Sequence, residues 1–373
     1  MCLYPKKIQN KKYTATEKNG GCIPDLPIID NTGIVPTYDQ RIVEIEVPCG
    51  QCIECRKSKA RDWQVRLNEE IKDWKYKYFV TLTFAPKELE QICLKTRLKE
   101  SNAVAEYAVR HMLERWRKTY KKSLKHWLIT ELGHEGTERI HLHGLFFTNE
   151  ELIFSEVDEH GLRSWSYWKY GAVYIGDYVN SRTINYISKY ITKIDDDHKG
   201  FIGKILASPG IGRRYIDNMH IKPVYKPKQA QDYYRLNTGV KVKLPKYYKN
   251  KLYNEDEREL IWREFLDKEK ISIMGVAHSQ REVPEDVINN IRDINRQKNK
   301  FLGYGDDSQE WRKKEYNITR NMLLQVQRLK GQKDMLQGLI KKQVANIEQV
   351  NQYYKICEKL EKIGKNSQKN LEE

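Results

Sequence analysis

Two histidines placed two residues apart are the first residues of this chain whose spacing suggests chemistry. His141 and His143 lie in the apolar run Ile140–Phe147, which is typical of a β-strand. Alternate residues of a strand point to the same face, so the two imidazoles would face one point and could hold a metal ion. By themselves, two such histidines can equally be hydrogen-bonded members of a sheet.

A carboxylate on the neighbouring strand would complete a metal site. Glu131 ends a short apolar run that we expect to form a hairpin with the histidine strand, through the polar loop at residues 132–139. The hairpin would bring the Glu131 carboxylate to His141 and His143. His134, in the loop, is a competing third ligand. An open set of imidazole and carboxylate ligands suits Mg²⁺ or Mn²⁺ acting on a phosphate.

Two tyrosines downstream could supply a nucleophile. Tyr186 and Tyr190 share one face of a helix that we expect at about residues 183–194. Tyrosines at this spacing are more often packing residues, but Lys189 and Lys193 are also four apart, so the helix would present parallel rows of phenols and ammonium groups. A phenol, whose ordinary pKa is about 10, needs such cations or a metal-activated phosphate to attack. We therefore interpret Tyr186, Tyr190 and Lys189 as candidate catalytic residues for phosphodiester cleavage.

A cluster of cysteines predicts a second metal site. The chain has seven cysteines, and three of them are spaced like metal ligands: Cys49, Cys52 and Cys55. A ferredoxin-like run would place a further cysteine near position 59, where the sequence has Lys59. The fourth ligand must then be remote, with Cys2 the first choice and Cys22 the second. We favour a structural Zn²⁺ over unligated thiols and over an iron–sulfur cluster.

The charge of the chain points to a polyanionic partner. The 373 residues carry a net charge of +16, and residues 181–253 hold 16 Lys and Arg against five Asp, with tyrosines interleaved. Cations that neutralise phosphates and rings that stack on bases suit single-stranded DNA. Lys193, Arg213 and Arg214 are candidate DNA contacts. The alternative is a solvated basic surface whose tyrosines pack in the core.

The hydropathy of the chain excludes a membrane partner by insertion. Mean hydropathy is −0.79, and no apolar run approaches the roughly 20 residues of a spanning helix. The N-terminal residues have no apolar signal-peptide region, so a reducing cytoplasm is the expected compartment.

Hydrophobic periodicity predicts the elements that would position these residues. We expect strands at residues 78–84, 127–131, 140–147 and 170–178, and helices at residues 54–75, 103–122 and 183–194. Hairpin connections without strict alternation of strand and helix favour an α+β fold, with a central antiparallel sheet and helices on one face. Beyond about residue 255 the chain is charged, and its pattern favours helix.

Several of these motifs together resemble a known family. His141-Leu142-His143 and the run Tyr186–Lys193, with Thr81-Leu82-Thr83 upstream, resemble the three motifs of the HUH endonucleases that initiate rolling-circle replication. The runs Pro48–Arg56 and Ser208–Tyr215 are similar to the replication initiation proteins of gokushovirus-type microviruses, which are small single-stranded DNA phages. The resemblance covers roughly residues 45–255.

The resemblance implies a fold and an activity. It implies an HUH endonuclease domain at residues 59–255, after a Cys-rich segment at 1–58 that zinc would stabilise and before a charged helical region at 256–373. One tyrosine would nick origin DNA and keep the strand as a 5′-phosphotyrosine, leaving a 3′-OH for the host DNA polymerase in the host cytoplasm. The sequence has no Gly-x-x-x-x-Gly-Lys-Ser/Thr loop, so a host helicase would unwind the duplex.

Two other interpretations stay open from the sequence. A related HUH transposase or plasmid initiator would use the same residues on different DNA. A zinc-stabilised nucleic-acid-binding protein without catalysis would use His141 and His143 only as members of the sheet.

Overall fold

The computed structural model divides the chain into two compact units. The first comprises Met1–Glu131, Ile140–Ile194 and Ile202–Gln309, and the second comprises Leu132–Arg139, Asp195–Phe201 and Glu310–Glu373. The structure describes residues 2–13, 40–98, 100–134, 138–159, 162–176, 178–195, 197–198, 201–219, 226, 229–236, 239–279, 281–306 and 329–372. The domain boundaries expected near residues 58 and 255 stay a prediction.

The described elements mix helices with short strands. The helices are α1 (Ile53–Glu70), α2 (Pro86–Thr96), α3 (Ser101–Tyr120), α4 (Ser181–Thr192), α5 (Arg214–Asp217), α6 (Lys246–Leu252), α7 (Glu255–Asp267), α8 (Glu285–Phe301) and α10 (Ile347–Glu372). The strands are β1 (Lys6–Gln9), β2 (Glu44–Val47), β3 (Tyr76–Leu82), β4 (Lys125–Leu132), β5 (Ile140–Thr148), β6 (Arg163–Trp165), β7 (Trp168–Gly176), β8 (Ile205–Ala207), β9 (Tyr233–Arg235), β10 (Lys241–Lys243), β11 (Lys270–Ile273) and β12 (Val276–Ser279). None of the described helices is long and apolar enough to cross a membrane.

A six-stranded antiparallel sheet forms the centre of the first unit. Its strand order is β6-β7-β3-β5-β4-β8, so the histidine strand β5 lies between β3 and β4. In the β3–β5 pairing Thr81 lies opposite His143, and in the β3–β7 pairing it lies opposite Tyr174. The expected α+β class with an antiparallel sheet is confirmed.

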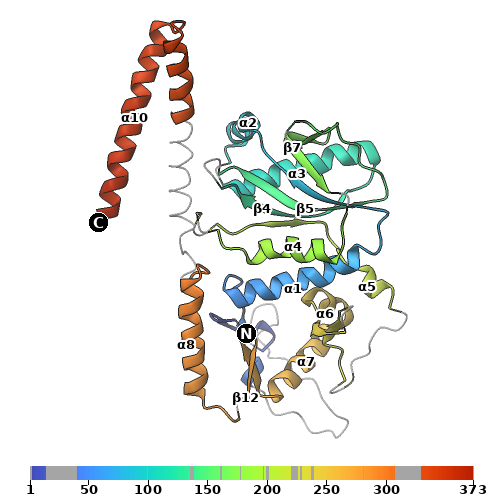
Figure 1. The fold of residues 1–373 in the computed structure, drawn as a ribbon. Coiled ribbons are helices and arrows are strands. Elements are labelled where there is room, and N and C mark those ends of the chain that lie inside the picture. The colour runs from blue at the N-terminus through green and yellow to red at the C-terminus, as the bar shows by residue number, and fades with distance from the viewer. Residues whose placement is uncertain are drawn as a thin grey trace. The chain divides into compact units, whose positions relative to one another are not determined.

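Helices cover both faces of this sheet, so the expectation of helices on one face is wrong (Figure 1). Phe146 of β5 packs through Trp165 onto Trp116 of α3. The next residue, Phe147, points the other way and joins a core cluster with Ile187 of α4, to which α1 also contributes. The physical reason is that β5 is apolar at consecutive positions, and a strand buried on both sides needs a covering layer on each.

One glycine sets the approach of β4 to β5. A Cβ added at Gly144 would come within 2.3 Å of the Trp127 carbonyl oxygen and 2.4 Å of Leu128 Cδ2. Only glycine therefore fits at this point of the sheet. Gly144 is the residue after His143, so the constraint acts directly beside the candidate ligands.

Helix α4 is fixed by its cap and by one apolar face. The Asn180 side chain accepts hydrogen bonds from the Arg182 and Thr183 backbone N–H groups, and Thr183 completes a capping box. Behind this cap a set of isoleucines at spacings of three and four is buried: Ile184, Ile187 and Ile191. This packing turns Tyr186, which is 51% exposed, away from the core.

Several elements near the chain ends and edges were not expected from the sequence. Pro86, expected to stop a strand, also begins α2. The expected helical region after residue 255 contains the hairpin β11–β12, whose turn residues Met274 and Gly275 both have positive φ. Ile271 and Ile273 of this hairpin pack with Leu3 in a small core beside the cysteine cluster.

Candidate functional site

Glu131, His141 and His143 converge at one point of the sheet. The Nε2 atoms of His141 and His143 lie 3.2 Å and 2.9 Å from the same carboxylate oxygen, Glu131 Oε2. All three side chains are partly buried, and their ligand atoms lie within 4.8 Å of one another. The structure thus brings together the three residues expected to hold a divalent metal.

The neighbouring strand fixes the orientation of His143. Thr81 lies opposite His143 in the β3–β5 register, and its Oγ1 is 2.9 Å from His143 Nδ1. If Nδ1 carries the proton and donates it to Thr81, the lone pair of Nε2 faces Glu131. A ring nitrogen held in this way by a neighbouring group is the usual arrangement for a metal-binding histidine.

Positive neighbours keep the Glu131 carboxylate ionised. Burial opposes its ionisation, but the two imidazoles and the Lys193 ammonium hold the pKa of Glu131 well below its usual range. Lys193 Nζ forms an ion pair with Glu131 Oε1, the oxygen that does not face the histidines. The site therefore presents a carboxylate that carries its negative charge at neutral pH.

The two tyrosines lie directly beside this cluster. The ring of Tyr190 stacks on the ring of His143, with centroids 4.6 Å apart and planes at 19°. The hydroxyls of Tyr186 and Tyr190 are 2.9 Å apart, and Tyr186 also meets Phe79 edge to face. Tyr190 is half-buried, and this burial together with the hydrogen bond to Tyr186 raises its pKa. A phosphate at the cluster would thus have two phenols within reach.

The lysines do not form the expected row on α4. The helix ends at Thr192, and Lys193 has an extended backbone (φ −59°, ψ 131°), which sends its side chain back to Glu131 and to within 5.9 Å of the Tyr190 ring centroid. Lys189 is exposed in the last turn of the helix. The row of ammonium groups failed as an expectation because helical spacing does not continue past the C-cap. Lys193, expected only to contact DNA, is the lysine that meets the cluster.

His134 lies in a different group from the one predicted. Among the described residues, the ligand atoms around His141 and His143 include Glu131 and not His134. His134 instead lies with Asp195 and His198, two residues that sequence reasoning missed. Their spacing in the chain, a histidine three residues after an aspartate, is the signal that could have drawn attention to them.

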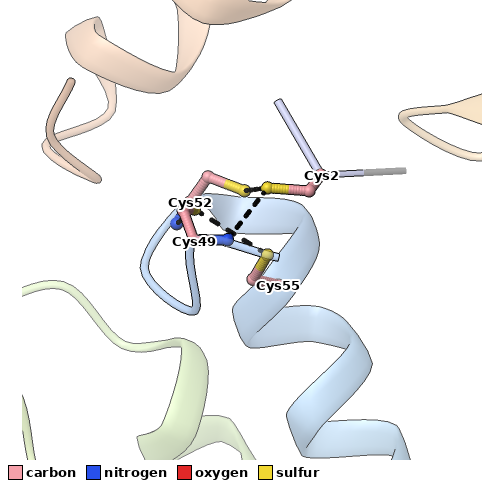
Figure 2. Close-up of side chains that lie close together, drawn as sticks. All are labelled: Cys2, Cys49, Cys52 and Cys55. Atoms are coloured by element: carbon pink, nitrogen blue, oxygen red, sulfur yellow. Dashed lines mark hydrogen bonds between the residues drawn. The ribbon is translucent and has the colours of Figure 1, made fainter. Parts of the chain in front are cut away.

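The predicted cysteine cluster assembles with Cys2 (Figure 2). Cys2 Sγ is 3.9 Å from Cys52 Sγ, and Cys49 Sγ is 3.8 Å from Cys55 Sγ. The ligand atoms of all four lie within 4.8 Å of one another, and no disulfide joins them. Hydrogen bonds among the thiols, that from Cys2 foremost, lower the pKa of Cys52 to about 6. Cys22 lies outside the described residues.

The candidate DNA-binding arginines lie on an exposed turn before and within α5. Arg213 pairs with Asp217, and Arg214 pairs with Asp73 at 3.0 Å, while both side chains stay more than half exposed. The preceding Gly212 has φ +73°, and an added Cβ would come within 2.5 Å of the Tyr248 hydroxyl. The Ser208–Tyr215 run therefore has a packing role as well as two exposed cations.

Comparisons with known proteins agree with this arrangement. Residues 77–195, which include all of the His, Glu and Tyr cluster, match the family model of the replication-associated protein ORF2. Over 280 residues the chain is 27% identical to the replication-associated protein ORF2 of Spiroplasma virus 4, covering 68% of this chain and 82% of that protein. It is 24% identical over 260 residues to the replication-associated protein VP4 of Bdellovibrio phage phiMH2K, covering 65% and 78%. No solved structure matches the chain significantly.

These matches define a class for the chain. The resemblance to microvirus-type replication initiators, drawn above from short motifs, is confirmed. The relatives are replication-associated proteins of phages, which supports a role in the initiation of phage DNA replication.

Proposed function

We propose that this protein nicks and rejoins origin DNA in rolling-circle replication, through a tyrosine of α4 and with HUH chemistry. The observation that carries the proposal is the direct packing of Tyr190 on His143, because it puts a phenol oxygen beside a cluster suited to hold a metal and a phosphate. The exposed phenol of Tyr186, 2.9 Å from that of Tyr190, gives the site a second nucleophile.

The reaction exchanges one phosphodiester bond for another. The phenol oxygen forms a bond to phosphorus while the bond to the 3′-oxygen breaks, and the proton lost by the phenol is balanced by the proton that the 3′-oxygen gains. The product is a 5′-phosphotyrosine and a free 3′-OH, which a host DNA polymerase would extend after a host helicase opens the duplex. Because the covalent link keeps the energy of the diester, rejoining needs no ATP.

The donor set of the cluster fits a divalent cation. Two imidazole nitrogens and one ionised carboxylate oxygen face one point, while the remaining directions are left for phosphate and water. Mg²⁺ or Mn²⁺ held there by His141, His143 and Glu131 would polarise the scissile phosphate and neutralise developing charge.

Lys193 would act next to this cation on both the enzyme and the DNA. Its ammonium pairs with Glu131 Oε1 and lies over the Tyr190 ring, so it is the cation closest to the proposed nucleophile among the described lysines. A DNA phosphate entering the site would compete with Glu131 for this ammonium. Lys189, Arg213 and Arg214, all exposed, would bind the strand on either side.

The two phenols would allow two successive cuts. While one tyrosine holds the 5′ end of the displaced strand, the other is free to attack the regenerated origin, and the freed 3′-OH can then close the first strand into a circle. The two hydroxyls are near enough for both to reach one phosphate position in turn.

The four cysteines would hold a structural zinc ion. Cys49 and Cys52 precede or cap the N-terminus of α1, the helix that packs under α4, so zinc bound there would anchor the helix that supports the tyrosines. This part of the proposal supplies stability and no step of the reaction.

Covalent trapping tests the nuclease proposal. The full-length protein is incubated with Mg²⁺ and a single-stranded origin oligonucleotide that carries a label on the side that becomes the 5′ end, and transfer of the label to protein is followed on a denaturing gel. Tyr186→Phe/Tyr190→Phe and His141→Ala should abolish the adduct, whereas Tyr174→Phe, an exposed tyrosine of β7, should retain it. An adduct that persists in the double phenylalanine variant would remove the assignment of the nucleophile.

A further inference from the structure

A second cluster of imidazole and carboxylate side chains lies within the smaller unit of the chain. His134 comes from the segment between β4 and β5, and Asp195 and His198 come from the segment between α4 and β8. One ligand atom of each lies within 4.8 Å of the others. The cluster shares no residue with the three ligands beside the tyrosines or with the four cysteines.

The cluster is built into a buried position. His198 is 3% exposed and Asp195 is 9% exposed, so neither is a chance neighbour on a solvated surface. Glu138 adds a second carboxylate, because its Oε1 lies 3.7 Å from His198 Nε2. The other oxygen, Glu138 Oε2, is buried and has no hydrogen-bond partner in the described part of the chain. A buried carboxylate oxygen without a partner is costly, and a cation beside it would remove that cost.

The two imidazoles are oriented in the way that metal-binding histidines usually are. His134 Nδ1 lies 2.6 Å from Asp197 Oδ2, and His198 Nδ1 lies 2.8 Å from Asp195 Oδ2. A carboxylate that accepts the Nδ1 proton fixes the tautomer with its lone pair on Nε2. The rings of His134 and His198 are 5.9 Å apart between centroids, so both can belong to one site.

We propose that His134 and His198, with carboxylate oxygens from Asp195 and Glu138, bind a divalent transition metal ion of the zinc type. Two imidazoles favour such an ion over Mg²⁺ or Ca²⁺, which prefer sites made only of oxygen. The ion is structural, because it joins the segment at residues 132–139 to the segment at residues 195–201 and because no nucleophile belongs to the cluster. The chain thus has a third metal site, which does not depend on the proposed nuclease activity.

Zinc stoichiometry in a background without the catalytic ligands tests this site. Full-length His141→Ala/His143→Ala protein is saturated with Zn²⁺, dialysed, and analysed for zinc per chain by mass spectrometry of the metal. Adding His134→Gln, a substitution of a partly exposed side chain, should lower the content by one equivalent per chain. The matched control is His111→Gln on α3, outside the cluster, which should leave the content unchanged.

X-ray absorption at the zinc edge gives a second measurement that does not depend on a variant's folding. In the His141→Ala/His143→Ala background we expect nitrogen and oxygen ligands in addition to sulfur, and in the triple variant sulfur alone. Asp197→Asn, which changes only the partner of His134, should weaken zinc binding by about 10- to 100-fold. Equal zinc content with and without His134→Gln, or sulfur ligands alone in the starting background, would overturn the proposal.

Discussion

Tyr190 stacks face to face on His143, with ring centroids 4.6 Å apart, and this contact joins the proposed nucleophile to the proposed metal cluster. It also explains why two elements distant in the chain must be correctly placed at once. His143 is held by its strand and by Thr81, and Tyr190 is held by the buried isoleucine face of α4.

The first prediction separates the two phenols. Tyr186→Phe and Tyr190→Phe each keep the ring and remove one hydroxyl, so each single variant should still form a covalent adduct through the remaining phenol. Each should fail to transfer the bound strand to a second origin oligonucleotide, because that step needs both hydroxyls. Peptide mapping of the adduct by mass spectrometry identifies the tyrosine used. An adduct on the same other residue in both variants would contradict the assignment of either phenol.

The second prediction concerns Thr81. Thr81→Val keeps the shape of the side chain and removes the partner of His143 Nδ1. Loss of such a partner typically weakens metal binding by about 10- to 100-fold, so the Mn²⁺ concentration needed for adduct formation should rise by that factor. Thr83→Val is the matched control, because the Thr83 hydroxyl donates to the Ala172 carbonyl oxygen and not to a histidine. Equal shifts in the two variants would show that His143 is not positioned by Thr81.

The third prediction separates Lys193 from Lys189. Lys193→Met removes a positive charge that pairs with Glu131, so the bound cation loses a like-charged neighbour worth about 1 kcal/mol, or roughly a fivefold lower requirement for Mg²⁺. Lys189→Met should leave the Mg²⁺ requirement unchanged. Both should weaken DNA binding about equally for all sequences and lower its salt dependence by about one ion. Titration of Mg²⁺ in the trapping assay and DNA binding at several salt concentrations measure the two effects. A shift in the Mg²⁺ requirement for Lys189→Met would contradict the assignment.

The fourth prediction tests the zinc ion at the cysteines. Cys52 is 1% exposed within the four-thiol cluster, so Cys52→Ser should remove one equivalent of zinc and lower the free energy of unfolding by several kcal/mol. A chelator should lower the melting temperature of the unchanged protein and have a smaller effect on the variant. Cys93→Ser on α2, outside the cluster, should change neither quantity. Full zinc content in Cys52→Ser would exclude this residue as a ligand.

The fifth prediction concerns pH and His126. Burial lowers the pKa of His126, whose Nδ1 lies 3.0 Å from the Leu124 carbonyl oxygen. The unfolded chain therefore binds this proton more readily than the folded chain. Stability should fall as pH drops below about 6.5, at up to about 1.4 kcal/mol per pH unit for this group. Chemical denaturation between pH 5 and pH 8, about the window of the shift, should show a shallower fall for His126→Gln. Identical slopes would exclude His126 as a source of acid sensitivity.

The sequence predicts the metal cluster more completely than it predicts the fold. Strand alternation placed His141 and His143 on one face, and the expected hairpin brought Glu131 to them, because both rules are local. The choice of Glu131 over His134 depends on how the intervening loop turns, which no local pattern specifies. The same is true of Lys193, since the helix ends one residue before it.

The layers of the fold show a similar division. The absence of alternation in Ile140–Phe147 is itself a sign of a strand buried on both faces, although the run alone predicts no more than a strand. The strand β8, three residues long, pairs with β4 through a contact between distant segments that local periodicity does not reveal. Cys2 joins Cys52 across 50 positions of the chain, a pairing that thiol spacing could suggest only as one of two choices.

The side chain missing at Gly144 determines how near the carboxylate and the imidazoles can come. Because Gly144 has only a hydrogen where other residues carry carbon, the backbone of the histidine strand rests against the carbonyl of Trp127. Gly144→Ala would push the two strands apart by a methyl group's width without touching a ligand. The reach of Glu131 to its partners is thus governed by a residue that has no chemistry of its own.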